Sequence, residues 1–378
     1  MTDIARRPAA ASTLPGRAEV WLDAIVPTLG LRVVVLLFGG VALIVFRPDA
    51  AIGVTVLDLW NRWDGPHFLE LARGGYGAPT DPARIVLLPL FPALIALVSV
   101  VLDPLLAAMT ISFAATLVSA AGLYLLARLD AGASVGRIAV LGMLMFPTAF
   151  TLVAPYSEAL FLALSVWSFL VARRGNWRAA GLLALLAGAT RIQGLFIGPA
   201  LLIEFLHQRR RLDRDVLWLA LAAGGPLIYL IVNWATFGDP LHFLEVQREV
   251  FRVETVAPWV GIANALNGVL AYRPEEFWVT VYLAPFLAFT GLALVVAWAL
   301  VARGGRPSYA VFAGLSLLSF ASLSWPISVP RYLMGVFPVF LAIGWTAGRP
   351  WLASIVVVAS GLLFAVFATL FVIGHWAF

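Results

Sequence analysis

A polar stretch near the start of this apolar chain carries residues suited to acid–base chemistry. It reads DLWNRWDGPHFLELARGGYG over positions 58–77. The apolar spacing predicts a helix over 67–73 that is stopped by Gly74–Gly75. Asp64 stands just before this helix, where an immobilised carboxylate can act as a general base. The alternative is that Asp64 only caps the helix.

His67 follows Asp64 by three positions and is expected on the same helical face. An Asp/His pair at this spacing could hold a divalent metal. The interpretation that we favour is that His67 hydrogen-bonds a substrate or a neighbouring side chain. The pattern requires no cofactor, so a metal is possible at Asp64 and His67 without being necessary.

Three further charged residues are expected at the same membrane face as Asp64. Arg191 and Arg331 fall at the outer ends of apolar segments, and Glu158 lies on a Pro-Tyr-Ser-Glu turn. An arginine at membrane depth is costly and marks function by default, although it can instead extend to the interface. Glu158 could orient an acceptor or Arg191, or it could be a helix-start carboxylate favoured by the helix dipole.

Composition decides the class of protein that must position these residues. The chain is 62% hydrophobic and only 12% charged, with a mean hydropathy of +0.96. A soluble core could not bury this much apolar surface, whereas a bilayer can solvate it. All 25 basic residues are Arg, and no Cys is present. The pI near 10 is explained by Arg in cytoplasmic loops rather than by nucleic-acid binding.

The apolar segments predict an all-α polytopic membrane protein. Twelve of them lie near 28–46, 87–102, 105–127, 137–153, 156–172, 177–191, 194–206, 216–236, 278–302, 309–324, 331–347 and 351–374. Alternation of the loops across the membrane requires one segment that does not cross. The short, proline-bearing 87–102 is the candidate for a re-entrant or interfacial element. About eleven transmembrane helices then remain.

The distribution of Arg predicts the orientation of the chain. Residues 1–27 read as a cytoplasmic tail, followed by a single membrane domain over 28–378. Loops 47–86 and 237–277 are then extracytoplasmic. The second loop contains an amphipathic segment that predicts a helix lying at the interface, with Asp239 as its cap.

Several motifs, taken in order, resemble one family. They are Arg62-Trp63-Asp64-Gly65-Pro66-His67-Phe68 with Gly75-Tyr76-Gly77, then Arg84 to Pro92, Phe146-Pro147, Pro155-Tyr156-Ser157-Glu158, Thr190-Arg191-Ile-Gln193-Gly194 and Pro330-Arg331-Tyr332. This series is similar to the PIG-V type mannosyltransferases, which include the second mannosyltransferase of GPI-anchor synthesis and bacterial relatives. Leu87–Leu88 departs from the aromatic residues that relatives often carry there.

The resemblance implies a GT-C fold with its active site at the extracytoplasmic surface and a polyprenyl-phosphate sugar as donor. It implies an inverting transfer with Asp64 as general base, and Arg191 and Arg331 as partners of the leaving phosphate. The other matched positions would bind substrate, namely Arg62, His67, Tyr76, Arg84, Glu158, Gln193 and Tyr332. The acceptor would be a lipid, a glycan or a protein. The all-Arg composition suggests the inner membrane of a bacterium.

Two other functions fit a chain of this class. A lipid-linked sugar flippase or other transporter predicts polar residues in broken helices near mid-membrane, whereas here the notable charges are expected at one surface. A membrane glycan polymerase or ligase would share the donor chemistry but is expected to carry a large outer loop rich in Arg and His. The loop 237–277 has a single His, His242.

Overall fold

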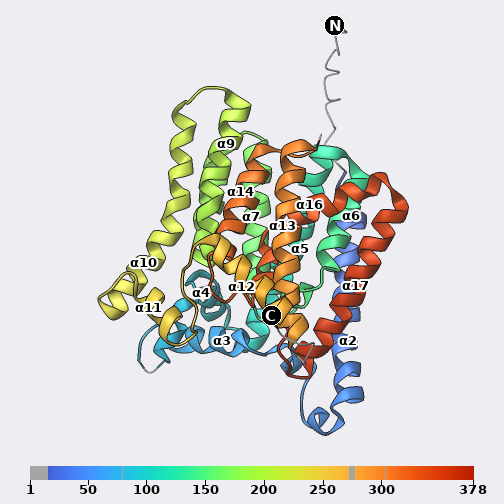
Figure 1. The fold of residues 1–378 in the computed structure, drawn as a ribbon, viewed down its shortest axis with the longest axis vertical. Coiled ribbons are helices and arrows are strands. Elements are labelled where there is room, and N and C mark those ends of the chain that lie inside the picture. The colour runs from blue at the N-terminus through green and yellow to red at the C-terminus, as the bar shows by residue number, and fades with distance from the viewer. Residues whose placement is uncertain (1–15, 79, 272–276, 303) are drawn as a thin grey trace.

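The computed structural model describes residues 16–78, 80–271, 277–302 and 304–378, and most of these residues are helical. Helices make up 79% of the structure, and these residues form no strand beyond an isolated bridge between Thr255 and Leu323. Figure 1 shows the long helices side by side in a bundle, with short helices across its lower end. The all-α class predicted from the sequence is confirmed.

Among the described residues, five helical stretches are long and apolar enough to cross a membrane. A straight crossing needs about 20 apolar residues, so these helices are consistent with an integral membrane protein. A bent pair, Val329–Gly335 and Pro338–Gly348, would be a sixth. The five stretches are Arg17–Phe46, Pro104–Ala131, Arg214–Phe237, Val279–Val301 and Pro350–Val372, which contain α2 (Val26–Phe46), α5 (Pro104–Ala131), α10 (Gly224–Phe237), α13 (Ala284–Val301) and α17 (Pro350–Val372).

The other helices of the bundle are shorter than a straight crossing requires. They are α6 (Ala133–Leu144), α7 (Glu158–Arg173), α8 (Trp177–Thr190), α9 (Ile197–Arg209), α14 (Pro307–Ala321), α15 (Val329–Tyr332) and α16 (Pro338–Gly344). Tight 3₁₀ turns interrupt several of the apolar segments. One reason is proline: Pro338 has no N–H to continue the preceding turn, and α16 starts there. The count of about eleven crossings therefore stays a prediction.

The first helix begins earlier than its apolar run suggested. α1 (Arg17–Val20) continues through a π-helical turn into α2 without a break. Residues 17–27, expected in the cytoplasmic tail, are thus helical, and the rest of that tail, 1–15, lies outside the described residues. The polar start is accommodated because Glu19 accepts a hydrogen bond from the hydroxyl of Tyr124 in α5 at 2.6 Å.

The first long loop lays a helix across one end of the bundle. α3 (Asp64–Gly74) lies there beside α4 (Leu90–Val98), and both pack on α5 (Figure 1). Phe68 of α3 meets Phe91 of α4 edge to face, with ring centroids 5.0 Å apart. α4 has only nine residues and is too short to cross a bilayer. That 87–102 is re-entrant or interfacial stays a prediction, with which this length is compatible.

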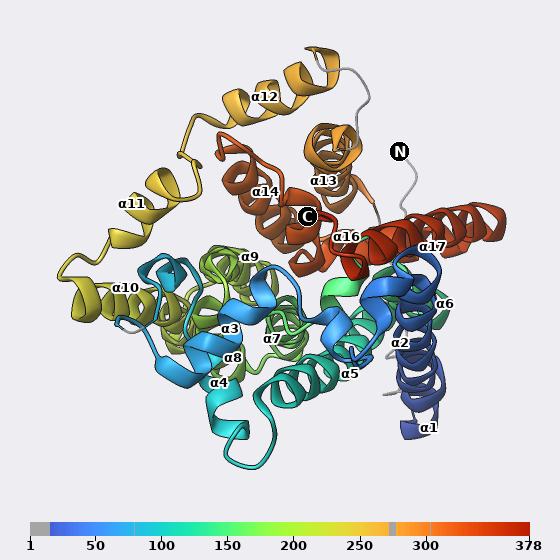
Figure 2. The same cartoon turned by 90° about the horizontal axis from the view of Figure 1, so that it is seen from below.

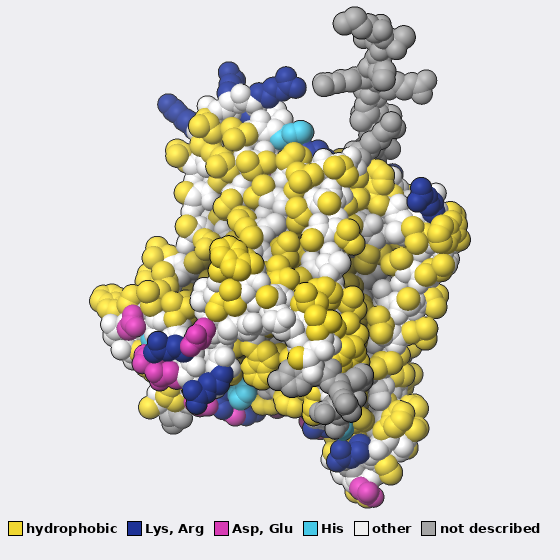
Figure 3. Space-filling model, viewed as in Figure 1, with side chains coloured by type: hydrophobic (Ala, Val, Ile, Leu, Met, Phe, Trp, Pro, Cys, Tyr) yellow, Lys and Arg dark blue, Asp and Glu magenta, His cyan; other side chains and the backbone are white. Residues whose placement is uncertain are grey.

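The two ends of the bundle differ in charge. α9 ends at Arg209, and the loop that follows it contains Arg210 and Arg211 and lies at the end opposite α3 (Figure 1). Figure 3 shows basic side chains at that end, whereas basic and acidic side chains are mixed at the end of α3. Cytoplasmic loops carry an excess of basic residues. We therefore expect the end with α3 to face outside.

Two helices form the second long loop, α11 (His242–Glu249) and α12 (Pro258–Ala271). Figure 2 shows both of them at the rim of the end face. Asp239 accepts a hydrogen bond at 2.9 Å from the backbone N–H of Leu241 in the turn before α11. The N-cap of α11 is Leu241 and no side chain caps this helix, so the predicted capping role of Asp239 is wrong. Of the predicted loop 237–277, residues 272–276 lie outside the described residues.

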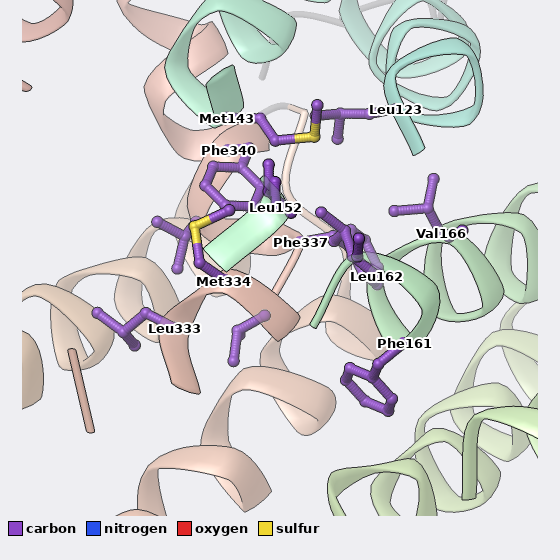
Figure 4. Close-up of a cluster of buried hydrophobic side chains, with 14 of the residues drawn as sticks. Leu123, Met143, Leu152, Phe161, Leu162, Val166, Leu333, Met334, Phe337 and Phe340 are labelled. Carbon is purple, nitrogen blue, oxygen red and sulfur yellow. The ribbon is translucent and has the colours of Figure 1, made fainter. Parts of the chain in front are cut away.

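Buried apolar side chains from α5, α6, α7 and the segment around α16 fill the middle of the bundle (Figure 4). They include Leu123, Met143, Leu162, Phe337 and Phe340. Lipid is as apolar as these side chains, so close packing rather than the hydrophobic effect holds them together. The packing fixes two irregular stretches, one before α7 and one before α16, from which the site is built.

Candidate active site

Four charged side chains from distant parts of the chain form one row at the end of the bundle where α3 lies. Nη1 of Arg331 is 2.7 Å from Oδ2 of Asp64, and its Nε is 3.2 Å from Oε1 of Glu158. The same Oε1 is 2.9 Å from Nη1 of Arg191. The structure thus brings together the predicted catalytic residue and three of the predicted binding residues. We call Asp64, Arg331, Glu158 and Arg191 the ion-pair row.

Asp64 is the first residue of α3 and not its cap. The N-cap is Trp63, and no side chain caps this helix. The capping alternative is therefore wrong, because the carboxylate of Asp64 pairs with Arg331 instead. Its side chain is 32% exposed against 7% for Arg331, so Asp64 is the member of the row most open to a ligand. The first turn also suits an anion, because helix N-termini carry partial positive charge.

Gly65 lets α3 approach the turn before α7. A Cβ at this position would lie 2.9 Å from Cγ of Pro155 and 2.8 Å from Oδ1 of Asn61. Real Cβ atoms essentially never come this close to other heavy atoms, so the approach needs a residue without a side chain. Gly65 therefore explains how Asp64 comes to lie beside the turn that ends in Glu158.

Glu158 and Arg191 occupy the adjoining ends of α7 and α8. Glu158 begins α7, while Arg191 follows α8 in an extended conformation and donates a hydrogen bond to Oγ of Ser157 at 3.1 Å. The side chain of Glu158 is only 2% exposed, and a buried charge needs a partner. The row supplies two arginines to this one carboxylate.

The central contacts of the row are close without being aligned hydrogen bonds. Among the described residues, neither Oε1 of Glu158 nor Nε of Arg331 has a hydrogen-bond partner by geometry, although both take part in ion pairs. Nε of Arg331 is buried beside Glu158, whereas its Nη1 faces the more exposed Asp64, so an incoming oxyanion is best placed to meet the guanidinium at Nη1.

Two tyrosines support the row. The guanidinium of Arg331 lies 5.3 Å from the ring centroid of Tyr156 and 5.6 Å from that of Tyr332. Arg191 lies 5.2 Å from the Tyr332 ring. Such cation–π contacts hold an arginine in place without neutralising its charge. Tyr332 was predicted as a site residue.

Tyr156 was quoted in a motif but not predicted as a site residue. Its hydroxyl accepts a hydrogen bond from the backbone N–H of Asp64 at 3.3 Å and donates one to the carbonyl of Arg62 at 3.0 Å. The phenol thus ties the turn before α7 to the start of α3. The signal that could have found it is its place one residue before the Ser-Glu pair of the same turn.

His67 and Arg84 form a separate cluster. Nε of Arg84 donates to Nδ1 of His67 at 3.1 Å, and Arg84 also pairs with Glu70. A cation beside the imidazole disfavours a second cation at the same place. The described residues contain no group of three or more His, Asp or Glu side chains that could hold a metal ion. His67 thus meets neighbouring side chains rather than Asp64.

Three other predicted residues lie outside the row. Tyr76 donates its hydroxyl proton to the carbonyl of Leu87 at 2.5 Å, and burial raises the pKa of this hydroxyl, which keeps it protonated as a donor. Arg62 donates from Nη2 to the carbonyl of Val372 at 3.3 Å. Gln193 is buried, and its Oε1 accepts no hydrogen bond from the described residues.

A second buried charge cluster corrects the expectation that the notable charges gather at one surface. It lies where α5, α7 and α9 end, opposite the ion-pair row. Glu204 accepts hydrogen bonds at 2.7 Å from Arg306, Ser308 and Gln208. Asp130 pairs with Arg173 in the same cluster. Its carboxylates are well supplied with donors, so it is suited to joining helices.

A comparison with known protein families gives no matching family model for this chain, and a search of curated proteins gives no match either.

Proposed function

We propose that the protein is a membrane glycosyltransferase that takes a sugar from a polyprenyl-phosphate donor, and that the sugar is mannose. The observation that carries the proposal is the ion-pair row, in which the partly exposed carboxylate of Asp64 stands beside the buried Arg331 and near the partly buried Arg191. Transfer from a lipid phosphate needs a base for the acceptor hydroxyl and cations for the leaving phosphate. The sugar and the carrier come from the resemblance to the PIG-V type mannosyltransferases, as does a GT-C fold with about eleven crossings.

In this mechanism Asp64 takes the proton of the acceptor hydroxyl while the oxygen of that hydroxyl attacks the anomeric carbon. The bond between that carbon and the phosphate oxygen breaks, and the lipid phosphate leaves with the electron pair. Arg331 and Arg191 stabilise its charge, for which the forked guanidinium is better shaped than an ammonium. Attack from the face opposite the leaving group inverts the configuration of the sugar.

In the structure, the arginines that would bind the donor phosphate are already paired with carboxylates, so the phosphate must compete with a carboxylate for them. Two carboxylates already neutralise the two arginines of the row. A donor phosphate that binds Arg331 competes with Asp64, the more exposed of its two carboxylate partners. Donor binding would then release the Asp64 carboxylate for the acceptor. No step in this scheme requires a metal.

The proposed setting is the outer surface of a bacterial inner membrane. The row includes Asp64, the first residue of α3, and α3 lies at the end of the bundle away from the arginine-rich loop after α9 (Figure 1). This placement supports an extracytoplasmic site under the positive-inside rule. The partners would be membrane lipids, the lipid-linked donor and a lipid, glycan or protein acceptor.

Donor turnover by the purified protein tests the proposal. The protein in lipid nanodiscs is incubated with radiolabelled polyprenyl-phosphate mannose, and with the glucose and arabinose analogues in parallel. We expect donor hydrolysis or transfer with the mannose donor, and its loss in the Asp64→Asn variant. Absence of turnover with all three donors, or equal turnover by the variant, would refute the proposal.

A further inference from the structure

The segment that ends α17 contacts the loop that leads into Asp64. Trp60 stacks on Phe371, with ring centroids 6.1 Å apart. The Arg62 guanidinium is bonded to the carbonyl at the end of α17, as described above. Trp63 packs edge to face on Trp376, with ring centroids 5.1 Å apart. Three of the four residues before Asp64 are therefore in contact with residues 371–376.

A sharp turn brings Trp376 to this place. α17 ends at Val372, and Gly374 has a φ of +86°, a conformation that glycine adopts without strain. The backbone N–H of His375 then donates to the carbonyl of Leu370 at 2.8 Å. The chain thereby folds back on α17, and Figure 2 shows its last residues near the centre of the end face.

The folded-back segment is anchored by its own side chains. Ala377 and Phe378 are buried, at 0% and 1% exposure. The Phe378 ring meets that of Phe367 in α17 at 4.8 Å between centroids. Trp376 thus lies between the buried residues Ala377 and Phe378 and the end of α17. Its ring is therefore held in place where Trp63 packs on it.

Trp63 needs such a surface because its backbone is strained. Its φ is +52°, in the left-handed region that a bulky residue rarely adopts. Conformations of this kind persist only where the surroundings hold them, and they concentrate at functional sites. Trp63 is the residue whose dihedral angles set where α3 starts and where Asp64 points. Trp63 is 37% exposed, so its ring contact with Trp376 is an important restraint.

We propose that Trp376 is a positioning residue: by packing on Trp63 it fixes the start of α3 and holds the Asp64 carboxylate in line for the acceptor. The proposal rests on the proposed glycosyl transfer. Trp376 touches neither Arg331 nor Arg191 in the contacts described above, so it would act on the base and not on the phosphate site.

Two measurements on Trp376→Ala and Trp376→Phe test the proposal. Hydrogen exchange of peptides covering residues 58–74 reports whether the loop is held, and it needs no activity. Turnover with polyprenyl-phosphate mannose reports positioning. The matched control is Trp351→Ala, because Trp351 is 64% exposed at the other end of α17.

We expect faster exchange in residues 58–74 for Trp376→Ala and unchanged exchange for Trp351→Ala. The Ala variant should lose kcat on the order of 100-fold, since a misplaced catalytic group costs about that much, while KM for the donor changes little. Trp376→Phe keeps a ring on Trp63 and should recover most of the loss.

Unchanged exchange in a folded Trp376→Ala variant would show that Trp376 does not hold residues 58–74 in place. Faster exchange with an unchanged kcat in Trp376→Ala would overturn the positioning role. So would a rise in KM for the donor as large as the fall in kcat. If the wild-type protein transfers no sugar but the exchange result is as expected, Trp376 does hold the loop before α3, and the proposed function is wrong.

Discussion

The side chain of Arg331 joins two carboxylates that the sequence keeps far apart, with Nη1 at 2.7 Å from Asp64 and Nε at 3.2 Å from Glu158. One carboxylate is a third exposed and the other is buried. The buried partner therefore holds the arginine in place, while the exposed partner can be exchanged. This difference separates the roles that we assign to Asp64 and Glu158.

Asp64→Asn should abolish turnover while leaving the protein folded. An amide cannot accept the acceptor proton, and removing a general base typically costs 10²–10⁴ in rate. The carboxylate caps no helix, so little stability should be lost. Turnover and thermal unfolding of the purified variant check this. A variant that keeps more than roughly a tenth of wild-type turnover would move the base to Glu158 or Asp58.

The same variant should bind the donor phosphate at least as tightly as the wild type. Removing the charge of Asp64 removes the competitor for Arg331, and an ion pair to a carboxylate that is 32% exposed is worth at most about 1 kcal/mol. Affinity for polyprenyl phosphate should therefore rise by up to about fivefold. Titration of nanodiscs with that lipid measures it, and a clear loss of affinity would contradict the competition between Asp64 and the phosphate.

The membrane class and the members of the ion-pair row could be predicted from the sequence, for different reasons. Long apolar runs have only one solvent that suits them, so class follows from composition. Glu158, Arg191 and Arg331 were found because each lies in a short motif at the end of an apolar segment, and Asp64 because it lies in a motif of the polar stretch 58–77. Charged residues at such places are costly and therefore informative.

The local role of Asp64 was harder to predict. Gly65 and Pro66 suggested a helix start for which Asp is a preferred cap, yet the helix begins at Asp64 itself because Trp63 adopts a positive φ. No sequence rule predicts that conformation for tryptophan. The Trp376 contact was also missed, because a tertiary contact with a residue so distant in the chain leaves no local pattern.

Crossings were harder still to count. The sequence shows apolar length but not the 3₁₀ turns that break it, such as the one over Leu333–Gly335 between α15 and α16, inside the apolar segment 331–347. In that turn Gly335 packs so tightly that a Cβ would lie 2.8 Å from Cδ1 of Phe161 in α7. Such turns depend on neighbouring helices, which a hydropathy profile does not contain.

Arg331→Lys and Arg191→Lys should each impair turnover although the positive charge is kept. Lysine loses the forked pair of donors that fits a phosphate, and losing one charged hydrogen bond costs about 1.5–3 kcal/mol. We expect kcat/KM to fall roughly tenfold or more, with the larger effect at Arg331, which serves two carboxylates. Steady-state kinetics with the mannose donor check this. Wild-type rates and donor affinity in both variants would rule out contact with the phosphate.

Topology can be tested directly because the chain has no native Cys. Ala78→Cys lies in the first loop and Arg211→Cys in the loop after α9, and both positions are exposed. In intact cells a membrane-impermeant maleimide should label the first and spare the second. Labelling of Ala78→Cys only after the inner membrane is breached would place the ion-pair row on the cytoplasmic side.

Glu158→Gln should destabilise the protein more than any other single change in the row. Glu158 is 2% exposed and is the carboxylate shared by Arg191 and Arg331. An amide in its place leaves the buried guanidinium of Arg331 and the partly buried one of Arg191 without their shared anion, and breaking a buried pair costs about 3–5 kcal/mol. The matched control is Glu245→Gln. The Glu245 side chain is 51% exposed where it pairs with His242, so this pair should contribute about 0–1 kcal/mol to stability. Thermal unfolding in nanodiscs compares the two variants.

Added polyprenyl phosphate should restore part of the stability lost in Glu158→Gln, because a bound oxyanion takes the place of the missing carboxylate. Equal melting temperatures for the two variants would show that Glu158 is not the anion that holds the arginines together.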